Sequence, residues 1–66
     1  MDLQVNGKPI TLDVGHTIED LLIYLNLDPK GVAVAINHRV VPRSSIGEHG
    51  LVEKDQVEII RAVGGG

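Results

Sequence analysis

The sequence predicts an α+β fold in which a mixed sheet of four to five strands packs on one main helix. The first observation is an alternating hairpin pattern over residues 2–14, and the second is a single amphipathic helix pattern over 16–29. Three further strand-like segments follow the helix. Strands on both sides of one helix in the chain form a sheet that the helix covers, and 66 residues are enough for one domain.

A hairpin is the first element expected. Before and after Asn6-Gly7, apolar residues alternate with polar ones. This dipeptide suits a tight turn whose two central residues have positive φ. Ile10, Leu12 and Val14 alternate with Thr11 and Asp13, and Ile10 and Leu12 are expected to face the helix, because successive side chains of a strand point to opposite faces.

One helix is expected over residues 16–29. Thr17 is a favourable N-cap, and Asp20 three residues later can complete a capping box. Asp28-Pro29 is expected to end the helix, because proline disfavours helical backbone at the residue before it. The apolar residues recur at spacings of three, four and seven and form one face, which consists of Ile18, Leu21, Leu22 and Leu25.

The remaining segments complete the sheet. Two strands are expected within 31–42, joined by a turn at Asn37-His38, and an irregular stretch with one short helical turn is expected over 43–56. The last strand, 56–63, is apolar on both faces, which is typical of a central strand covered on both sides. Pairing the first strand with the last in the middle of the sheet gives the layout called β-grasp. Its expected inner residues are Leu3, Val5, Ile10, Leu12, Val34, Ile36, Val57 and Ile59.

Composition excludes several classes of function. The chain has no cysteine, which removes disulfides, thiolate metal sites and cysteine nucleophiles. Its net charge is −3, its six basic residues are scattered and Tyr24 is its single aromatic residue, so nucleic acid is not an expected partner. No apolar run is long enough to span a bilayer and nothing resembles a signal peptide. The compartment expected is the cytoplasm, without membrane attachment.

Candidate metal and acid–base residues are unconvincing. His16, His38 and His49 lack metal-ligand spacing, so no metal site is expected. Carboxylates such as Glu19 and Asp55 fall at caps and loops, where a solvated surface is the interpretation. General acid–base catalysis needs a pKa that burial or a close like charge has shifted. The sequence therefore predicts no catalytic residue.

The glycine run 64–66 follows the last strand without a polar linker. Residues 1–63 are expected to form the domain, and Gly64, Gly65 and Gly66 a flexible tail. One interpretation is a frayed end. The other is a reaction site, because a Gly66 carboxylate joined to AMP from ATP becomes a mixed anhydride that a sulfur or nitrogen nucleophile can attack. Three extended residues reach ~10 Å, far enough to enter a narrow channel of a partner.

The whole chain resembles the ubiquitin-like sulfur carriers of thiamine biosynthesis. The similarity runs in register through VNGK, TIEDLL, VAVAIN, VVPRS and DQVEIIRAV to the glycines. VVPRS together with VEIIRAVGGG is the most specific combination. Two positions depart from the family pattern: Ile46 stands where relatives often carry tryptophan, and Lys54-Asp55 stands where Gly-Asp is common. Both positions lie away from the tail.

The resemblance implies a covalent sulfur shuttle and not a catalyst. A ubiquitin-activating-enzyme-like adenylyltransferase would activate the Gly66 carboxylate with ATP, and a cysteine desulfurase or another sulfur relay protein would supply the sulfur of a thiocarboxylate. Thiazole synthase would take that sulfur for the thiazole ring of thiamine. No bound cofactor is expected, since the activating enzyme uses the ATP.

The strand pattern also predicts a partner surface. If Val34 and Val57 face the helix, Ala33, Ala35, Ile60 and Ala62 face away from it and form a flat apolar patch beside the tail. Exposed apolar patches mark partner sites, and these four residues are expected to contact the activating enzyme. An ordinary sheet surface is the alternative.

Other functions stay open at this level. The small subunit of molybdopterin synthase and carriers for tRNA thiolation or cysteine synthesis share the tail chemistry, so the acceptor enzyme would decide the product. A different class is a regulatory β-grasp module that binds RNA or a small ligand. Such a module needs neither the glycines nor a free terminus.

Overall fold

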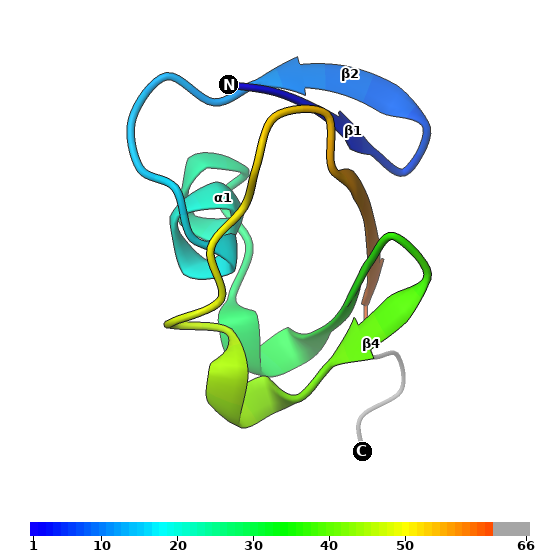
Figure 1. Cartoon of the computed structure of the whole chain (residues 1–66). Helices are drawn as coiled ribbons and strands as arrows, with labels where there is room; N and C mark the ends of the chain where they lie inside the picture. Colours follow the sequence, from blue (N-terminus) through cyan, green and yellow to red (C-terminus); the bar gives the residue numbers. More distant parts are fainter. Residues whose placement is uncertain (62–66) are drawn as a thin grey trace.

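A computed structural model describes residues 1–61, which form one sheet covered by a short helix (Figure 1). Residues 62–66, which include Ala62 and the predicted tail, lie outside the described residues. The strands are β1 (Asp2–Val5), β2 (Lys8–Thr11), β3 (Val32–Ile36), β4 (Arg39–Val41) and β5 (Gln56–Arg61); the helix is α1 (Ile18–Tyr24), and two 3₁₀ turns are η1 (Pro29–Gly31) and η2 (Arg43–Ser45).

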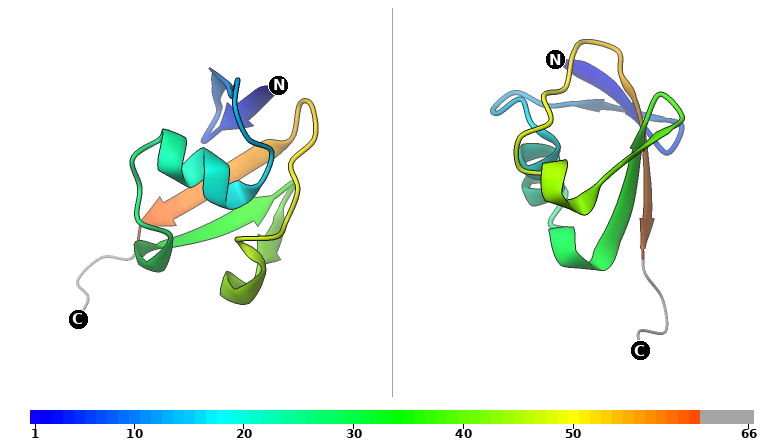
Figure 2. Two further views of the ribbon diagram at one scale, coloured as in Figure 1. Left: turned by 90° about the vertical axis from the view of Figure 1, so that its left-hand side faces the viewer. Right: turned by 60° about the horizontal axis from the view of Figure 1, so that its bottom comes forward.

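The sheet has the strand order β2-β1-β5-β3-β4. β1 pairs with β5 in parallel, and the other neighbours are antiparallel, so the sheet is mixed. Two further views show α1 and the irregular segment after β4 on the same side of the sheet (Figure 2). The predicted α+β layout, with the first and last strands adjacent in the centre, is confirmed.

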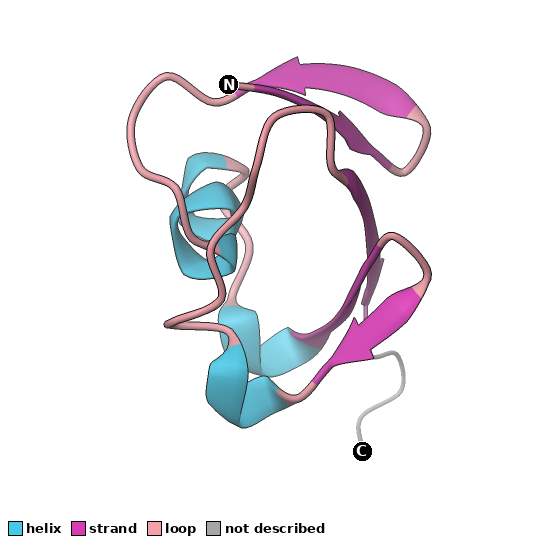
Figure 3. Cartoon of the chain, in the orientation of Figure 1, coloured by secondary structure: helices cyan, strands magenta, loops and turns pink. Residues whose placement is uncertain are grey.

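The core lies between α1 and the inner face of the sheet. Most of the expected inner residues are buried, although Ile10 is only partly so. Ile46 and Leu51 are also buried, and both come from the segment that the sequence marks as irregular. Figure 3 shows this segment as a long loop that passes α1. The buried apolar set is Leu3, Val5, Leu12, Ile18, Leu21, Leu22, Val32, Val34, Ile36, Val41, Ile46, Leu51, Val57 and Ile59.

Two expectations about the strands are wrong. The alternating hairpin pattern was expected to run to Val14, but β2 ends at Thr11. The chain leaves the ladder after Leu12 donates its N–H to the Met1 carbonyl, and Val14 is 84% exposed. β5 is central but is covered on one face only, since Ile60 is 68% exposed. In an open two-layer fold, one face of a central strand remains free.

The turns follow the sequence signals. Asn6 and Gly7 both have positive φ (51° and 81°), as do Asn37 and His38 (50° and 71°). Both two-residue turns therefore have positive φ at their two central residues, which matches the twist of the antiparallel strands that they join. The expected hairpins on each side of the sheet are confirmed.

The start of α1 is built as expected. The Asp20 N–H donates to Thr17 Oγ1 at 3.1 Å, and Asp20 Oδ2 accepts the N–H groups of Thr17 at 3.1 Å and of His16 at 2.9 Å. Gly15 has φ +95°, and a Cβ there would lie 2.6 Å from the Asp20 side chain. The capping box is confirmed, and a glycine leads into it because no side chain fits.

The end of α1 differs from the prediction. Asn26, at φ 62°, reverses the chain after Tyr24, and its N–H reaches the Ile23 carbonyl at 3.0 Å. The Leu27 N–H bonds the Leu22 carbonyl at 2.8 Å, which completes a Schellman motif. The proposed stop at Asp28-Pro29 is wrong, because that dipeptide begins η1.

Candidate functional site

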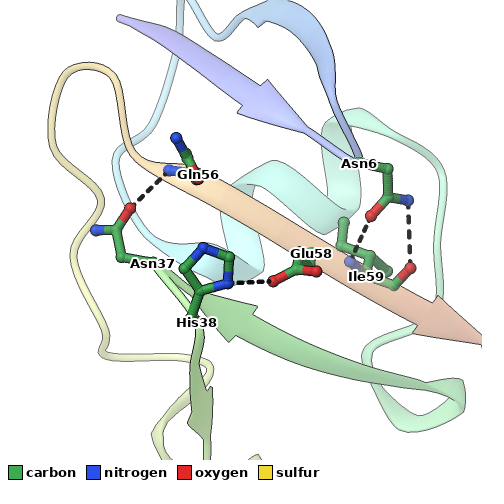
Figure 4. Close-up of polar contacts among 6 residues, drawn as sticks. All are labelled: Asn6, Asn37, His38, Gln56, Glu58 and Ile59. Atoms are coloured by element: carbon green, nitrogen blue, oxygen red, sulfur yellow. Dashed lines mark hydrogen bonds and ion pairs between the residues drawn. The ribbon is translucent and has the colours of Figure 1, made fainter.

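The candidate site is the end of the chain that β5 leads to. β5 pairs with β1 on one side and with β3 on the other, so both edges of the strand are held (Figure 4). The predicted reaction site, Gly66, and its neighbours Gly64 and Gly65 lie outside the described residues. What the structure shows is how the strand before them is fixed.

Asn6 holds the middle of β5. Its Oδ1 accepts the Ile59 N–H at 2.8 Å, and its Nδ2 donates to the Ile59 carbonyl at 3.2 Å. The Asn6 N–H also donates to the Val57 carbonyl at 2.8 Å. The carboxamide thus acts as an extra residue of β1, and it continues the pairing with β5 beyond the point where β1 turns away (Figure 4).

Asn37 and Asp55 hold the start of β5. Asn37 Oδ1 accepts the Gln56 N–H at 3.0 Å, and Asn37 Nδ2 donates to Asp55 Oδ1 at 3.0 Å. The other oxygen of Asp55 accepts the Val52 N–H at 2.9 Å. Asp55 is only 6% exposed, so its interpretation as a solvated carboxylate is wrong. Both its oxygens are hydrogen-bonded to the protein, which gives it a structural role.

The outer face of the sheet carries an apolar patch. Ala33 lies opposite Ile60 on β5, and Ala35 lies opposite Val40 on β4. Val40 is 78% exposed and was missing from the expected surface, although its alternation with buried Val41 is a readable signal. We call Ala33, Ala35, Val40 and Ile60 the outer patch. The fourth predicted member, Ala62, lies outside the described residues.

The two faces of the sheet carry different charged side chains. On the outer face, Glu58 contacts His38, with 3.4 Å between Glu58 Oε1 and His38 Nδ1 (Figure 4). The strand residues Lys8, Arg39 and Arg61 instead take helix-side positions: Lys8 lies opposite Val5, and Arg39 lies opposite Ile36. Arg61 follows Val57 and Ile59 by the period of two. Within the described strands, the outer face therefore carries no Lys or Arg.

Neither a metal centre nor a membrane segment is apparent within residues 1–61. No group of three or more His, Asp or Glu side chains there could hold a metal ion. His16 lies beside the helix start, His38 in the β3–β4 turn and His49 in the long loop. In the same part of the chain, no helix is long and apolar enough to cross a membrane.

Comparisons with known proteins agree with this geometry. The model of the ThiS family matches residues 3–66. The chain is 41% identical over 66 residues to a thiazole synthase of Magnetococcus marinus, but it spans only 20% of that relative's length. It is 30% identical to the sulfur carrier protein ThiS of Escherichia coli, with both chains covered in full. A crystal structure of the thiamine biosynthesis protein ThiS from Geobacter metallireducens superposes with a TM-score of 0.82, at 33% identity and full coverage of both chains.

The five-stranded mixed sheet packed on one helix, with a central last strand, defines a ubiquitin-like β-grasp domain. The chain belongs to the ThiS family, because the family model covers almost all of it. The resemblance seen in the sequence is thereby confirmed. The family is one of small carriers and not of catalysts, and the Escherichia coli relative is named a sulfur carrier protein.

Proposed function

We propose that the chain carries sulfur for thiamine biosynthesis as a thiocarboxylate at Gly66. The observation that carries this proposal is the family match, which extends through the glycine run to residue 66. The names of the relatives support it, since they include a sulfur carrier and a thiazole synthase. The chain is a co-substrate of other enzymes in this scheme, and we place it in the cytoplasm.

The chemistry uses the terminal carboxylate and no side chain. A carboxylate oxygen of Gly66 attacks the α-phosphorus of ATP on an adenylyltransferase that resembles the ubiquitin-activating enzymes, and pyrophosphate leaves. A persulfide, delivered from a cysteine desulfurase or another relay protein, then attacks the acyl carbon and displaces AMP, which gives an acyl disulfide. A second thiol of the relay protein cleaves this disulfide, so that the thiocarboxylate leaves and the two protein sulfurs end as a disulfide. The thiocarboxylate that results donates its sulfur to the thiazole ring on thiazole synthase. The chain itself needs no bound cofactor.

The folded body contributes a fixed starting point for this chemistry. Asn6 and Asn37 hold β5 from two sides, so the position of Arg61 at the end of this strand is fixed relative to the rest of the domain. Gly66 is the fifth residue after Arg61, and five residues span at most ~17 Å. An enzyme that acts on Gly66 therefore works close to this end of the domain. In our proposal the outer patch, together with Ala62, contacts the adenylyltransferase.

The identity of the enzyme that accepts the sulfur decides which product is made. Carriers for molybdopterin, tRNA thiolation or cysteine synthesis share the tail chemistry. The full-length match of this chain to part of a thiazole synthase favours the thiazole ring as the destination. A regulatory RNA- or ligand-binding module has no comparable support, because its function would not require the match through residue 66.

Intact-mass spectrometry tests the proposal. The chain is incubated with ATP, an adenylyltransferase of this family and a sulfur donor. We expect a mass gain equal to one sulfur replacing one oxygen. Deleting Gly66, or adding one residue after it, should abolish the gain, whereas adding one residue before Met1 is the matched control and should not. A native chain that stays unmodified beside an active enzyme would refute the carrier.

A further inference from the structure

A cleft lies at the end of β5, between the end of α1 and the first hairpin. Its floor is apolar and consists of Ile10 from β2, Leu25 and Leu27 after the helix, and Ile59 from β5. Ile10, Leu25 and Leu27 are only partly buried, so the floor is reached by solvent. An open apolar floor of this kind is a place where another apolar group can be buried.

Two cations stand at the rim of this cleft. Lys8 and Arg61 both line it, and both are exposed. Their register places them on the helix side of the sheet, next to buried Val5 and Ile59. Within residues 1–61 the one close contact between a basic side chain and a carboxylate is that of His38 and Glu58, so neither rim cation has a carboxylate partner there.

We propose that this cleft, the basic cleft, binds an acidic and apolar segment of the enzyme that activates Gly66. The inference rests on the proposed function and names the chemistry of the contact. A lone anion would leave the floor exposed, and a purely apolar group would leave the two cations uncompensated. A segment with a large apolar side chain next to a carboxylate satisfies both parts of the cleft.

The position of the cleft supports this occupant. Arg61 is both a rim residue and the last residue before 62–66, and the ~17 Å reach of those five residues brings the enzyme to this end of the domain. The outer patch lies on the opposite face of the sheet, beside Glu58, and the outward-facing positions of the described strands carry no Lys or Arg. The enzyme therefore meets opposite charges on the two faces, which fixes its orientation on the carrier.

Charge reversal at the rim tests the inference. The variants Lys8→Glu and Arg61→Glu are compared with Lys54→Glu, which makes the same change of charge at the opposite end of β5, where the Lys54 N–H bonds the Asp2 carbonyl. Steady-state adenylation by a family adenylyltransferase is measured for each chain. We expect each rim variant to raise the KM for the carrier about tenfold with little change in kcat, and to weaken the salt dependence of kcat/KM.

Each outcome is decisive. A KM for both rim variants equal to that of Lys54→Glu would overturn the basic cleft and leave the carrier intact. A loss confined to Arg61→Glu would assign the effect to the chain leading to Gly66 and would also overturn the cleft, since Lys8 lies on a different strand. Native chain that is not adenylated at all would refute the proposed function itself.

Discussion

Asn6 and Ile59 are 53 residues apart in the chain, yet the Asn6 carboxamide bonds both the N–H and the carbonyl of Ile59. One side chain in a hairpin turn thus completes the pairing of the strand that leads to the predicted reaction site (Figure 4). The same turn position needs positive φ, which asparagine tolerates better than most residues.

The first prediction concerns these two bonds. Asn6→Gly keeps the positive φ and removes the carboxamide, so it should lower the free energy of unfolding by about 1–3 kcal/mol. Asn26→Gly is the matched control, because Asn26 also has positive φ but its side chain makes no hydrogen bond within residues 1–61. Urea denaturation measures both variants. Equal effects would show that the carboxamide bonds do not stabilise the sheet.

The second prediction concerns buried Asp55. Asp55→Ala should cost about 1–3 kcal/mol, because it leaves the Val52 N–H and Asn37 Nδ2 without their acceptor at a partly buried site. Asp13→Ala removes an exposed carboxylate and should change stability by less than about 0.5 kcal/mol. Chemical denaturation of both variants provides the comparison. An Asp55 variant as stable as the Asp13 variant would contradict the structural role.

The third prediction uses the backbone at Lys54, which has φ 70°. A residue with a Cβ is strained there, so Lys54→Gly should raise the free energy of unfolding by about 0.5–1 kcal/mol after the greater unfolded-state entropy of glycine is counted. Lys54→Ala removes the same side chain beyond Cβ but keeps the strain. It should therefore give no gain in a thermal unfolding measurement, and a gain equal to that of the glycine variant would contradict the argument.

The fourth prediction is a pH dependence at the helix start. The N–H groups of His16 and Thr17, together with the Thr17 hydroxyl, hydrogen-bond Asp20 and hold the pKa of its carboxyl below the ordinary value of 3.8. The folded state therefore binds this proton less readily than the unfolded chain. The resulting stabilisation is complete above the unfolded pKa and is lost as the pH falls through the lower folded value.

Unfolding of the native chain and of Asp20→Asn should be compared from about pH 7 down to about pH 2. The native chain should be the more stable at neutral pH, and the difference should shrink in acid as the native carboxyl is protonated. Glu19→Gln removes a negative charge from the same helix turn without removing these bonds. A native advantage over Asp20→Asn that stays constant across the range would contradict the assignment.

The fifth prediction tests the outer patch. Ile60→Glu should reduce adenylation at Gly66 by about tenfold or more, since it places a charge in a contact that we propose to be apolar. Ile23→Glu is matched in chemistry and exposure, because Ile23 is 65% exposed and lies on α1, away from the sheet. The rate of pyrophosphate release measures both. If the folded Ile60 variant is adenylated as fast as the Ile23 variant, the patch is not a docking surface.

Short sequence motifs predicted those parts of the fold that depend on contacts between residues close together in the chain. The turn at Asn6-Gly7 and the capping box of Thr17 and Asp20 were predicted from a few neighbouring residues, and both are confirmed. The helix end was wrong because two stop signals were present and the earlier one prevailed. Asn26 adopts positive φ before Pro29 is reached, and the Schellman bonds make that ending favourable.

Features that depend on distant partners could not be read from the sequence. Ile46 and Leu51 are isolated in a polar stretch, and only the passage of the long loop beside α1 buries them. Asp55 is buried because Asn37, 18 residues away, supplies a donor to it. The rim of the basic cleft joins Lys8 to Arg61, and only the pairing of β1 with both β2 and β5 brings these strands together.

The parallel pairing of β1 with β5 also has a mechanical consequence. The chain enters the sheet at the start of β1 and leaves it at the end of β5, two neighbouring strands that run the same way. Traction on the two ends slides one strand along the other, so the hydrogen bonds between them, with those of Asn6 to Ile59, bear the load together. A molecular motor that pulls the chain from its C-terminal side meets this shear-resistant pair first, before it can extract any other strand.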